Sequence, residues 1–257
     1  MKTKIFVVTH KAVPPLANDL YIPIQVGSRE DIYTGITRDN SGDNIADKNS
    51  SFCELTATYW ISKHIADADY VGICHYRRYF NFFNPLFNLK PSRQKPVTAE
   101  EFKQTAICKA SAETTDERIA AIFKSHDAIM LRAYNLENGL SESYYNEQGG
   151  HRKSDWDETL NIIRELYPEY SNSITQYLDE GKKFHMGNMI VTTKKIWNEY
   201  NQWLFSILFE LEKRIEVPSD PVQGRVFGYI SERIINLYVY HNKLRIKEMG
   251  GYKITDI

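Results

Sequence analysis

The sequence lacks the motifs that define several large enzyme classes. It has no phosphate-binding P-loop, no dinucleotide-type G-x-G-x-x-G, no zinc-binding H-E-x-x-H and no G-x-S-x-G elbow. Because each motif carries the chemistry of its class, NTP-driven chemistry, hydride transfer and acyl-serine hydrolysis are disfavoured.

Cysteine is scarce, and neither sign of charge dominates. The three cysteines, Cys53, Cys74 and Cys108, show no metal-ligand spacing, which is typical of reduced thiols in a cytosol. The formal net charge of −1, from 32 basic and 33 acidic residues, predicts no general attraction to nucleic acid or anionic membranes. Any anionic ligand must therefore be bound by a local cluster of cations.

Long apolar runs are missing as well. No segment of the 257 residues approaches the length of a transmembrane helix. The apolar run near the N-terminus, residues 5–8, is too short for a signal peptide and reads as a first strand. We therefore expect a cytoplasmic protein.

The most informative segment is Tyr70–Phe80, in which a short apolar run ends in histidine and two arginines. Tyr70–Cys74 is too short for a helix and reads as a strand, so His75, Tyr76, Arg77 and Arg78 would stand just past its carboxyl end. Open α/β sheets bind ligands there, and guanidinium groups match the oxygens of a diphosphate. The alternative is that these arginines pair with carboxylates while Tyr79 and Phe80 fill the core.

Strand and helix signals alternate along the chain, which predicts an α/β protein with a mixed sheet flanked by helices. A single domain over residues 1–257 is the simplest arrangement, with a strand-rich half at about 1–132 and a helix-rich half at about 133–257. Besides Tyr70–Cys74, strands are expected at Ile5–Val8, Ile22–Val26 and Asp127–Leu131. Capping boxes predict the starts of three helices, at Ser51 with Glu54, Thr98 with Glu101, and Thr114 with Glu117. A further helix is expected to start at 154–157, and two more to span Ile196–Arg214 and Val222–Tyr240. An ordered aromatic loop is expected at 81–96.

A polar loop at residues 39–49 precedes the first expected helix. It includes Asp43, Asn44, Lys48 and Asn49, whose side chains could cap the helix, fix turns or bind ligand hydroxyls. A calcium loop is excluded, because the regular ligand spacing and the terminal bidentate glutamate are missing.

Two further polar clusters lie in the C-terminal half. His185 and Asn188 flank Gly187 before an expected strand, where they could contact a sugar or line a buried turn. Arg225 and Glu232 are seven residues apart on an expected helix and share a face; a structural salt bridge is the commoner outcome of such a pair.

Several of these segments together resemble a known family. They are Gly42-Asp43-Asn44-Ile45-Ala46-Asp47-Lys48-Asn49, Cys53-Glu54-Leu55-Thr56, Cys74-His75-Tyr76-Arg77-Arg78-Tyr79-Phe80, Gly187-Asn188-Met189, and Ser231-Glu232-Arg233-Ile234-Ile235-Asn236 after Arg225. The chain is similar, over nearly its whole length, to an uncharacterised-domain family of bacterial capsule and exopolysaccharide synthesis, treated as glycosyltransferases related to the GT-A fold.

The resemblance implies transfer of a hexose, galactose or galactofuranose in some members, from a nucleotide-diphosphate sugar such as a UDP-sugar. The acceptor would be a glycan or lipid-linked glycan of capsule, exopolysaccharide or O-antigen synthesis. A lipid-linked acceptor would bring the protein to the inner face of the cell membrane, although no basic amphipathic anchor is evident.

The resemblance also suggests roles for the residues named above. The proposed roles are catalysis for Asp43, Glu232 and His75; donor and diphosphate binding for Thr9, His10, Lys11, Arg77, Arg78, Arg225 and Arg233; and sugar or acceptor binding for Asn44, Lys48, Asn49, Glu54, Tyr76, His185 and Asn188. Glu232 or Asp43 would be the base if the anomeric carbon is inverted.

The chain departs from the wider GT-A pattern in its metal site. Related enzymes hold Mg²⁺ or Mn²⁺ with a D-x-D pair after the central strand, where this chain has His75-Tyr76-Arg77. The chain has two D-x-D patterns, Asp67-Ala68-Asp69 and Asp155-Trp156-Asp157. The first precedes its strand and is typical of a turn. We therefore assign no metal ligand and expect Arg77 and Arg78 to neutralise the diphosphate.

Two alternatives stay open at this stage. One is a carbohydrate-binding or assembly protein of the same pathway that keeps the fold without turnover. The other is a nucleotide-sugar hydrolase, whose cleavage would not depend on an acceptor.

Overall fold

The computed structural model describes residues 1–13, 18–27, 30–83, 94–147 and 151–257. The strands are β1 (Thr3–Thr9), β2 (Tyr21–Gln25), β3 (Thr37–Arg38), β4 (Tyr70–His75), β5 (Arg78–Phe80), β6 (Gln94–Val97), β7 (Ala128–Leu131), β8 (Tyr134–Asn135), β9 (Lys183–Phe184), β10 (Ile190–Thr193), β11 (Ile246–Met249) and β12 (Gly251–Ile254). The α-helices are α1 (Asn49–Phe52), α2 (Leu55–His64), α4 (Ala99–Lys103), α5 (Ala106–Lys109), α6 (Ala112–Phe123), α7 (Leu140–Glu142), α8 (Lys153–Leu166), α9 (Ser171–Ser173), α10 (Lys194–Arg214) and α11 (Val226–His241). Short 3-10 or π segments are η1 (Ala46–Lys48), η2 (Ser143–Glu147), η3 (Pro168–Tyr170), η4 (Ile174–Asp179) and η5 (Gln223–Arg225).

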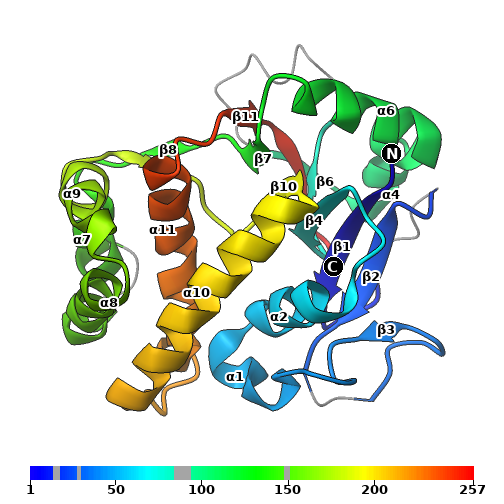
Figure 1. Ribbon diagram of the computed structural model, residues 1–257. Coiled ribbons are helices and arrows are strands. Elements are labelled where there is room, and N and C mark those ends of the chain that lie inside the picture. Colours follow the sequence, from blue (N-terminus) through cyan, green and yellow to red (C-terminus); the bar gives the residue numbers. More distant parts are fainter. Residues whose placement is uncertain (14–17, 28–29, 84–93, 148–150) are drawn as a thin grey trace.

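A mixed sheet forms the centre of the molecule (Figure 1). Its strand order is β11-β7-β10-β4-β1-β2-β3, and β5 extends it from β4 through β12 to β6. β1 pairs in parallel with β2 and β4, whereas β10 runs antiparallel to β4 and β7. The carboxyl ends of the parallel strands therefore meet at one edge, together with the start of β10. The expected mixed α/β architecture is confirmed.

Helices cover both faces of this sheet because its strands are apolar on both faces. In β1, Ile5 and Val7 join a core that also contains residues of α4, α5 and α6. Phe6 and Val8 face the other way, into a larger core shared with α2, α8, α10 and α11. Such continuous apolar strands are typical of sheets buried between two helical layers.

Some predicted helix starts are confirmed and others are wrong. Thr98 and Glu101 form the predicted capping box, in which the Thr98 hydroxyl accepts from the Glu101 N–H at 3.1 Å and the Glu101 carboxylate accepts from the Thr98 N–H at 2.7 Å. The Ser51–Glu54 box is wrong, because α1 ends at Phe52 and α2 begins at Leu55. The box at Thr114–Glu117 is wrong too, because Ser111 caps α6.

The long helices lie close to their predicted ranges, but several strands were not anticipated. α8 begins at Lys153 and α10 at Lys194, and η5 precedes α11, which begins at Val226. No strand was expected at Ile246–Met249 or Gly251–Ile254, although both join the main sheet. In the expected aromatic loop, Phe82 is buried and Pro96 lies in β6, whereas Pro85, Phe87 and Pro91 lie outside the described residues.

Within the described ranges, no helix combines the length and the apolar character that crossing a bilayer requires.

Gly72 provides a test of how closely the central strands pack. It stands opposite Ile5 of β1 and Val191 of β10, and a Cβ added there would lie 2.8 Å from Val191 Cγ2 and 3.3 Å from Ile5 Cγ1. We expect Gly72→Ala to lower the free energy of unfolding by about 1–3 kcal/mol, measured by urea denaturation.

The same substitution in a Val191→Ala background is the control. Removal of the Val191 methyls makes room for the new methyl, so the cost of Gly72→Ala should be smaller there. An equal cost in both backgrounds would contradict the steric explanation.

Candidate active site at the carboxyl ends of the strands

The loops after β1 and β4 lie side by side at the carboxyl edge of the sheet. The Tyr76 N–H donates to the Val8 carbonyl at 2.9 Å, and the His10 ring meets the Tyr76 ring edge-on with centroids 4.9 Å apart. The Arg77 guanidinium carbon lies 5.5 Å from the centre of the Tyr76 ring. These contacts place His10, Tyr76 and Arg77 on one surface, as the sequence predicted for residues that follow adjacent parallel strands.

Thr9 has a structural position in this loop. It is buried, and its hydroxyl accepts from the Lys11 N–H at 2.9 Å, which fixes the turn after β1. His10 and Lys11 are exposed. Of the three predicted donor-binding residues that follow β1, His10 and Lys11 are thus the ones whose side chains can meet a ligand.

His75, the last residue of β4, supports the turn before β10. Its Nε2 bonds to the Gly187 carbonyl oxygen, which can only accept, so Nε2 carries the proton. Burial lowers the pKa of His75, and the neighbouring Glu54 carboxylate opposes that shift. At neutral pH His75 is therefore an uncharged imidazole that holds the turn at Gly187.

Asn188 follows in that turn and links three elements. Its backbone is left-handed, with φ of 51°, which asparagine tolerates better than most residues. Its amide Nδ2 donates to Glu54 Oε1 at 2.8 Å and to Ser231 Oγ at 2.7 Å. Asn188 Oδ1 is buried and finds no hydrogen-bond partner among the described residues. The amide therefore fixes Glu54, at the start of α2, and α11 against the edge of the sheet.

Glu232 on α11 is the most perturbed carboxyl group of this cluster. Burial raises the pKa of Glu232 to about 7, the Glu54 carboxylate adds to the rise, and Arg233, Arg78 and Arg225 oppose it. In the part of the chain that the structure describes, no side chain hydrogen-bonds its carboxylate. A half-buried carboxyl that titrates near neutrality can accept a proton from a bound hydroxyl.

Arg78 and Arg225 supply positive charge to the same cluster. Arg78 opens β5 and stands opposite His75 in the strand pairing, and it forms no ion pair with any described carboxylate. Arg225 precedes α11, donates from Nε to Cys53 Sγ at 3.2 Å, and lies over the Tyr229 ring at 5.4 Å. Half-buried Arg78 is therefore not neutralised by a carboxylate among the described residues, and its contact with a diphosphate stays a prediction.

Cys53 is the junction residue behind this arrangement. Its φ of 54° breaks the helix between α1 and α2, and the Asn49 side chain donates to its carbonyl at 2.7 Å. Burial, and then the Glu54 carboxylate, raise the pKa of the Cys53 thiol to about 11. Cys53 is thus a neutral acceptor for Arg225, and its backbone turn delivers Glu54 to the site.

Arg233 is placed differently from the prediction. It is fully buried, and its guanidinium carbon lies 5.0 Å from the Tyr144 ring and 5.1 Å from the Phe184 ring. Its Nη1 donates to the Tyr229 carbonyl at 3.1 Å. This position gives Arg233 a packing role in the core and does not support the expected contact with a diphosphate.

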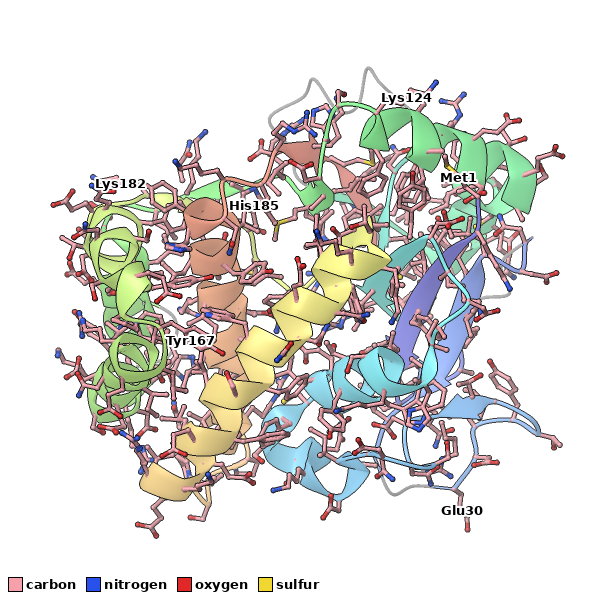
Figure 2. All side chains as sticks on the ribbon, in the orientation of Figure 1. Met1, Glu30, Lys124, Tyr167, Lys182 and His185 are labelled. Carbon is pink, nitrogen blue, oxygen red and sulfur yellow. The ribbon has the colours of Figure 1, made fainter. Side chains whose placement is uncertain are left out.

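His185 also lies in a buried network, beside α11 (Figure 2). Its Nδ1 is 3.0 Å from Asn236 Oδ1, and its Nε2 is 3.1 Å from Glu248 Oε1. The His185 N–H donates to the same Asn236 oxygen at 2.8 Å. The imidazole joins α11 to β11, so its geometry favours structural support over the predicted sugar contact.

Residues of the polar loop are mostly engaged in turns and ion pairs. Asn44 bonds the backbone of Gly42 and Ala46. Lys48 Nζ pairs with Glu212 at 2.6 Å, and Asp43 accepts from the Tyr59 hydroxyl at 2.9 Å. The ordinary turn-and-cap interpretation therefore accounts for Asn44, and the contacts of Asp43 and Lys48 lie outside the Glu54–Glu232 cluster.

The D-x-D pairs do not supply a metal site at this edge. Asp67 and Asp69 lie before β4 at the opposite edge, where Asp67 pairs with Lys2 at 2.5 Å and Asp69 accepts from the Lys2 N–H at 2.7 Å. Asp155 is buried and pairs with Arg152 at 2.9 Å. Among the residues with a described position, no three histidine, cysteine or acidic side chains gather closely enough to hold a metal ion. The described residues thus do not fit a divalent-metal site of the D-x-D kind.

The sequence did not identify Cys53, Ser231 or Tyr229 as site residues. Cys53 directly precedes Glu54, and Ser231 directly precedes Glu232. Their position next to predicted site residues was the signal that could have identified them. Tyr229 lies one helical turn beyond Arg225, a spacing that could have marked it as a partner for the guanidinium.

Comparisons with known proteins match this chain to a protein family and to a solved structure. A family model described as "Domain of unknown function (DUF4422)" matches residues 4–243. The solved apo structure of WbbM, a bifunctional glycosyltransferase, is similar with a TM-score of 0.88 and 30% identity, covering 100% of this chain and 46% of that one. This chain therefore spans a little under half of that protein's solved length. No curated protein matches the chain.

The raised pKa of Glu232 predicts a specific dependence of stability on pH. The unfolded carboxyl ionises near its ordinary pKa of 4.5, whereas the folded one keeps its proton up to about 7, so stability falls as pH rises between those values. We expect Glu232→Gln, which is uncharged at every pH, to gain about 1–2 kcal/mol relative to wild type between pH 4.5 and pH 8.

Urea denaturation at several pH values measures this difference. Glu169→Gln, at an exposed position outside the cluster, is the matched control and should follow wild type. A stability difference between Glu232→Gln and wild type that does not change with pH would show that Glu232 is not held protonated.

Proposed function

The chain belongs to the family of domains of unknown function DUF4422, and we propose that it is a glycosyltransferase. It would move a hexose from a nucleotide-diphosphate sugar to a glycan or lipid-linked acceptor. The similarity to a solved glycosyltransferase along the full length of the chain supports a glycosyltransferase-like fold. A UDP-sugar donor and surface-polysaccharide synthesis are the finer parts of this proposal, and they derive from the family resemblance of the motifs.

One observation carries the proposal: Arg78, without a carboxylate partner in the described chain, stands opposite His75 at the carboxyl edge of the sheet, where its charge acts on Glu232. Arg78 and Arg225 both lower the pKa of Glu232, which places their positive charge within reach of its carboxylate. Anion binding and proton acceptance at adjacent points are the two functions that displacement of a nucleoside diphosphate requires.

In the proposed reaction, Arg78 and Arg225 bind the diphosphate of the donor, with His10, Lys11 and Arg77 at the neighbouring loop. The acceptor hydroxyl gives its proton to the Glu232 carboxylate as its oxygen bonds to the anomeric carbon. The bond between that carbon and the diphosphate oxygen breaks, and the diphosphate leaves with the electron pair. Asn188, itself held by Ser231, fixes Glu54 in place, and Glu54 keeps Glu232 basic.

Arginine is the group that we propose for neutralising the leaving diphosphate. Its charge is permanent, and its planar fork matches two phosphate oxygens at once. The acidic pair Asp67 and Asp69 is engaged with Lys2 at the opposite edge of the sheet, so it does not supply ligands here.

We expect Arg78→Ala and Glu232→Gln each to lower kcat/KM for sugar transfer by about 10²-fold or more, because each removes charge stabilisation or proton transfer in the transition state. The assay incubates the full chain with UDP-, GDP- and CMP-sugars and measures release of nucleotide with and without a glycan acceptor. Arg245→Ala, which removes an exposed arginine paired with Asp127 before β7, is the control and should retain activity.

The assay outcomes separate the alternatives. No nucleotide release from any sugar would favour a non-catalytic carbohydrate-binding protein, and release that an acceptor never accelerates would favour a hydrolase.

Metal dependence is tested on the same assay. We expect turnover to persist in excess EDTA. Activity that disappears in EDTA and returns with Mn²⁺ would contradict the assignment of the diphosphate charge to arginine.

A further inference from the structure

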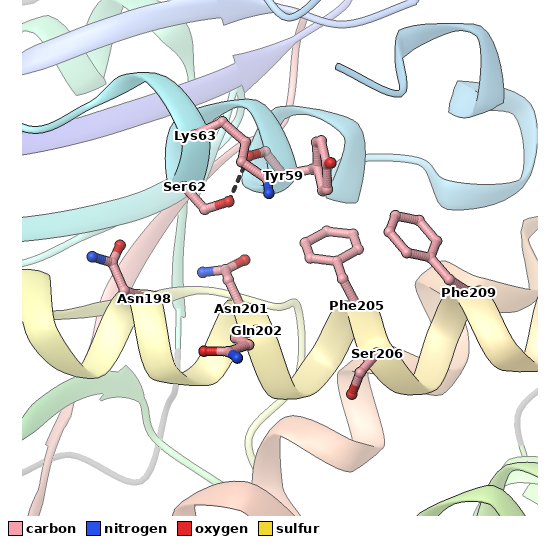
Figure 3. A pocket seen from close by; sticks show the side chains of 9 residues that line it. All are labelled: Tyr59, Ser62, Lys63, Asn198, Asn201, Gln202, Phe205, Ser206 and Phe209. Atoms are coloured by element: carbon pink, nitrogen blue, oxygen red, sulfur yellow. Dashed lines mark hydrogen bonds between the residues drawn. The ribbon is translucent and has the colours of Figure 1, made fainter. Parts of the chain in front are cut away.

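A groove lies between α2 and α10, apart from the candidate active site (Figure 3). Its volume is about 430 Å³, within the range of roughly 300–1,000 Å³ that is usual for small-ligand sites. The proposed reaction does not use this groove. The residues that line it indicate what kind of ligand it could bind.

One face of α10 supplies amide groups to the groove. Asn198, Asn201 and Gln202 lie three and four residues apart and are followed by Phe205 on the same face. Figure 3 shows Asn198, Asn201 and Phe205 pointing from α10 toward α2. Asn198 and Gln202 are exposed, and within the described chain no group hydrogen-bonds their side-chain amides.

Asn201 is the informative member of this row. It is only 2% exposed, and its Nδ2 donates to the Trp197 carbonyl at 2.7 Å. Its Oδ1 is buried with no hydrogen-bond partner among the described residues. A buried acceptor without a donor costs free energy, which a ligand hydroxyl in the groove would recover.

Aromatic rings form the other part of the lining. Tyr59 on α2 meets Phe205 edge-on with centroids 4.9 Å apart, and Phe209 lies 5.8 Å from Tyr59. Tyr59 and Phe209 are both partly exposed. Flat apolar rings beside amides suit a ligand that has C–H faces and many hydroxyls.

The charge of the groove is balanced. Lys63 is the one charged residue of its lining, and its Nζ lies 3.5 Å from Asp43. The Tyr59 hydroxyl donates to the same carboxylate. An acidic ligand would find no surplus cation here, and a basic ligand would find no unpaired carboxylate.

We propose that the α2–α10 groove binds a segment of neutral oligosaccharide. The choice of occupant rests on the proposed function, since a polymeric acceptor is a glycan that extends beyond the reacting unit. Glu54 of the candidate active site precedes α2, and Tyr59 follows it by about 7.5 Å along the helix at 1.5 Å per residue. The groove would therefore hold acceptor units on the same helix that positions Glu54.

Saturation-transfer NMR and calorimetry on the full chain test this directly. The probes are neutral tetrasaccharides from galactan, mannan and glucan, with tetragalacturonate as an acidic comparison and an amphipathic helical peptide as an apolar one. We expect a neutral tetrasaccharide to bind, and the double variant Asn198→Ala/Gln202→Ala to raise its Kd about fivefold to tenfold by loss of hydrogen bonds.

Glu199→Gln is the matched control, because Glu199 is an exposed neighbour on α10 that does not line the groove. It should leave the Kd unchanged. Absence of binding by every neutral probe, binding that the double variant does not weaken, or binding of only the acidic probe or the peptide would overturn the proposal.

Donor turnover, measured on the same samples, separates this inference from the proposed function. The double variant should release nucleotide from donor sugar without acceptor as wild type does, because neither residue belongs to the candidate active site. Turnover without groove-dependent binding would contradict the groove alone, whereas groove-dependent binding without any turnover would support the groove and contradict the transferase.

Discussion

The hydrogen bonds of the Asn188 amide hold the candidate site together. Three parts of the chain that are distant in sequence, the start of α2, the turn before β10 and the middle of α11, meet at this one group. The Asn188 amide nitrogen also lies 3.3 Å from the Gly228 carbonyl oxygen, and because Asn188 is buried, leaving this amide without partners would cost about 1–3 kcal/mol. Asn188 also accepts a left-handed backbone so that its amide reaches both partners. His75, at the end of β4, supports the same turn through its hydrogen bond to the Gly187 carbonyl. The position of Glu54 therefore depends on β4 as well as on the turn before β10.

The charges of the site depend on this framework. The Glu54 carboxylate raises the cost of ionising Glu232, and Arg78 and Arg225 offset part of that cost. The backbone of Cys53 contributes to the position of Glu54. Its positive φ ends α1, so Glu54 lies in the break between α1 and α2. A continuous helix through residues 49–64 would have carried Glu54 on a regular helical face. The break that contradicted the predicted capping box is thus the feature that places the carboxylate.

The sequence alone predicted the features of the fold that depend on local residue patterns. The strand at Tyr70–His75 follows from its apolar run, and parallel pairing with β1 then places His10 beside Tyr76 at one edge. Whether an arginine faces solvent or core depends on long-range packing, which residue spacing does not encode. Arg225 and Arg233 illustrate this: both lie near Glu232 in sequence, yet one borders the site and the other is enclosed by Tyr144 and Phe184. The sequence did not predict strands β11 and β12, because β11 pairs with β7, and β12 pairs with β5 and β6, all more than 100 residues away.

A site built on fixed arginines has consequences for the base beside them. Without a ligand, the positive charge of Arg78 and Arg225 acts on Glu232 and favours its ionised form. In the proposed reaction, a bound diphosphate would take up that positive charge and add negative charge of its own. Both effects raise the proton affinity of Glu232, so the carboxylate would become a stronger base once the donor is in place. The same rise lowers the ionised fraction of Glu232 at neutral pH, so proton acceptance from the acceptor hydroxyl would be favoured at a pH above the raised pKa. The half-buried position of the cluster is what makes this coupling effective, since charges of exposed groups would be screened by water and salt.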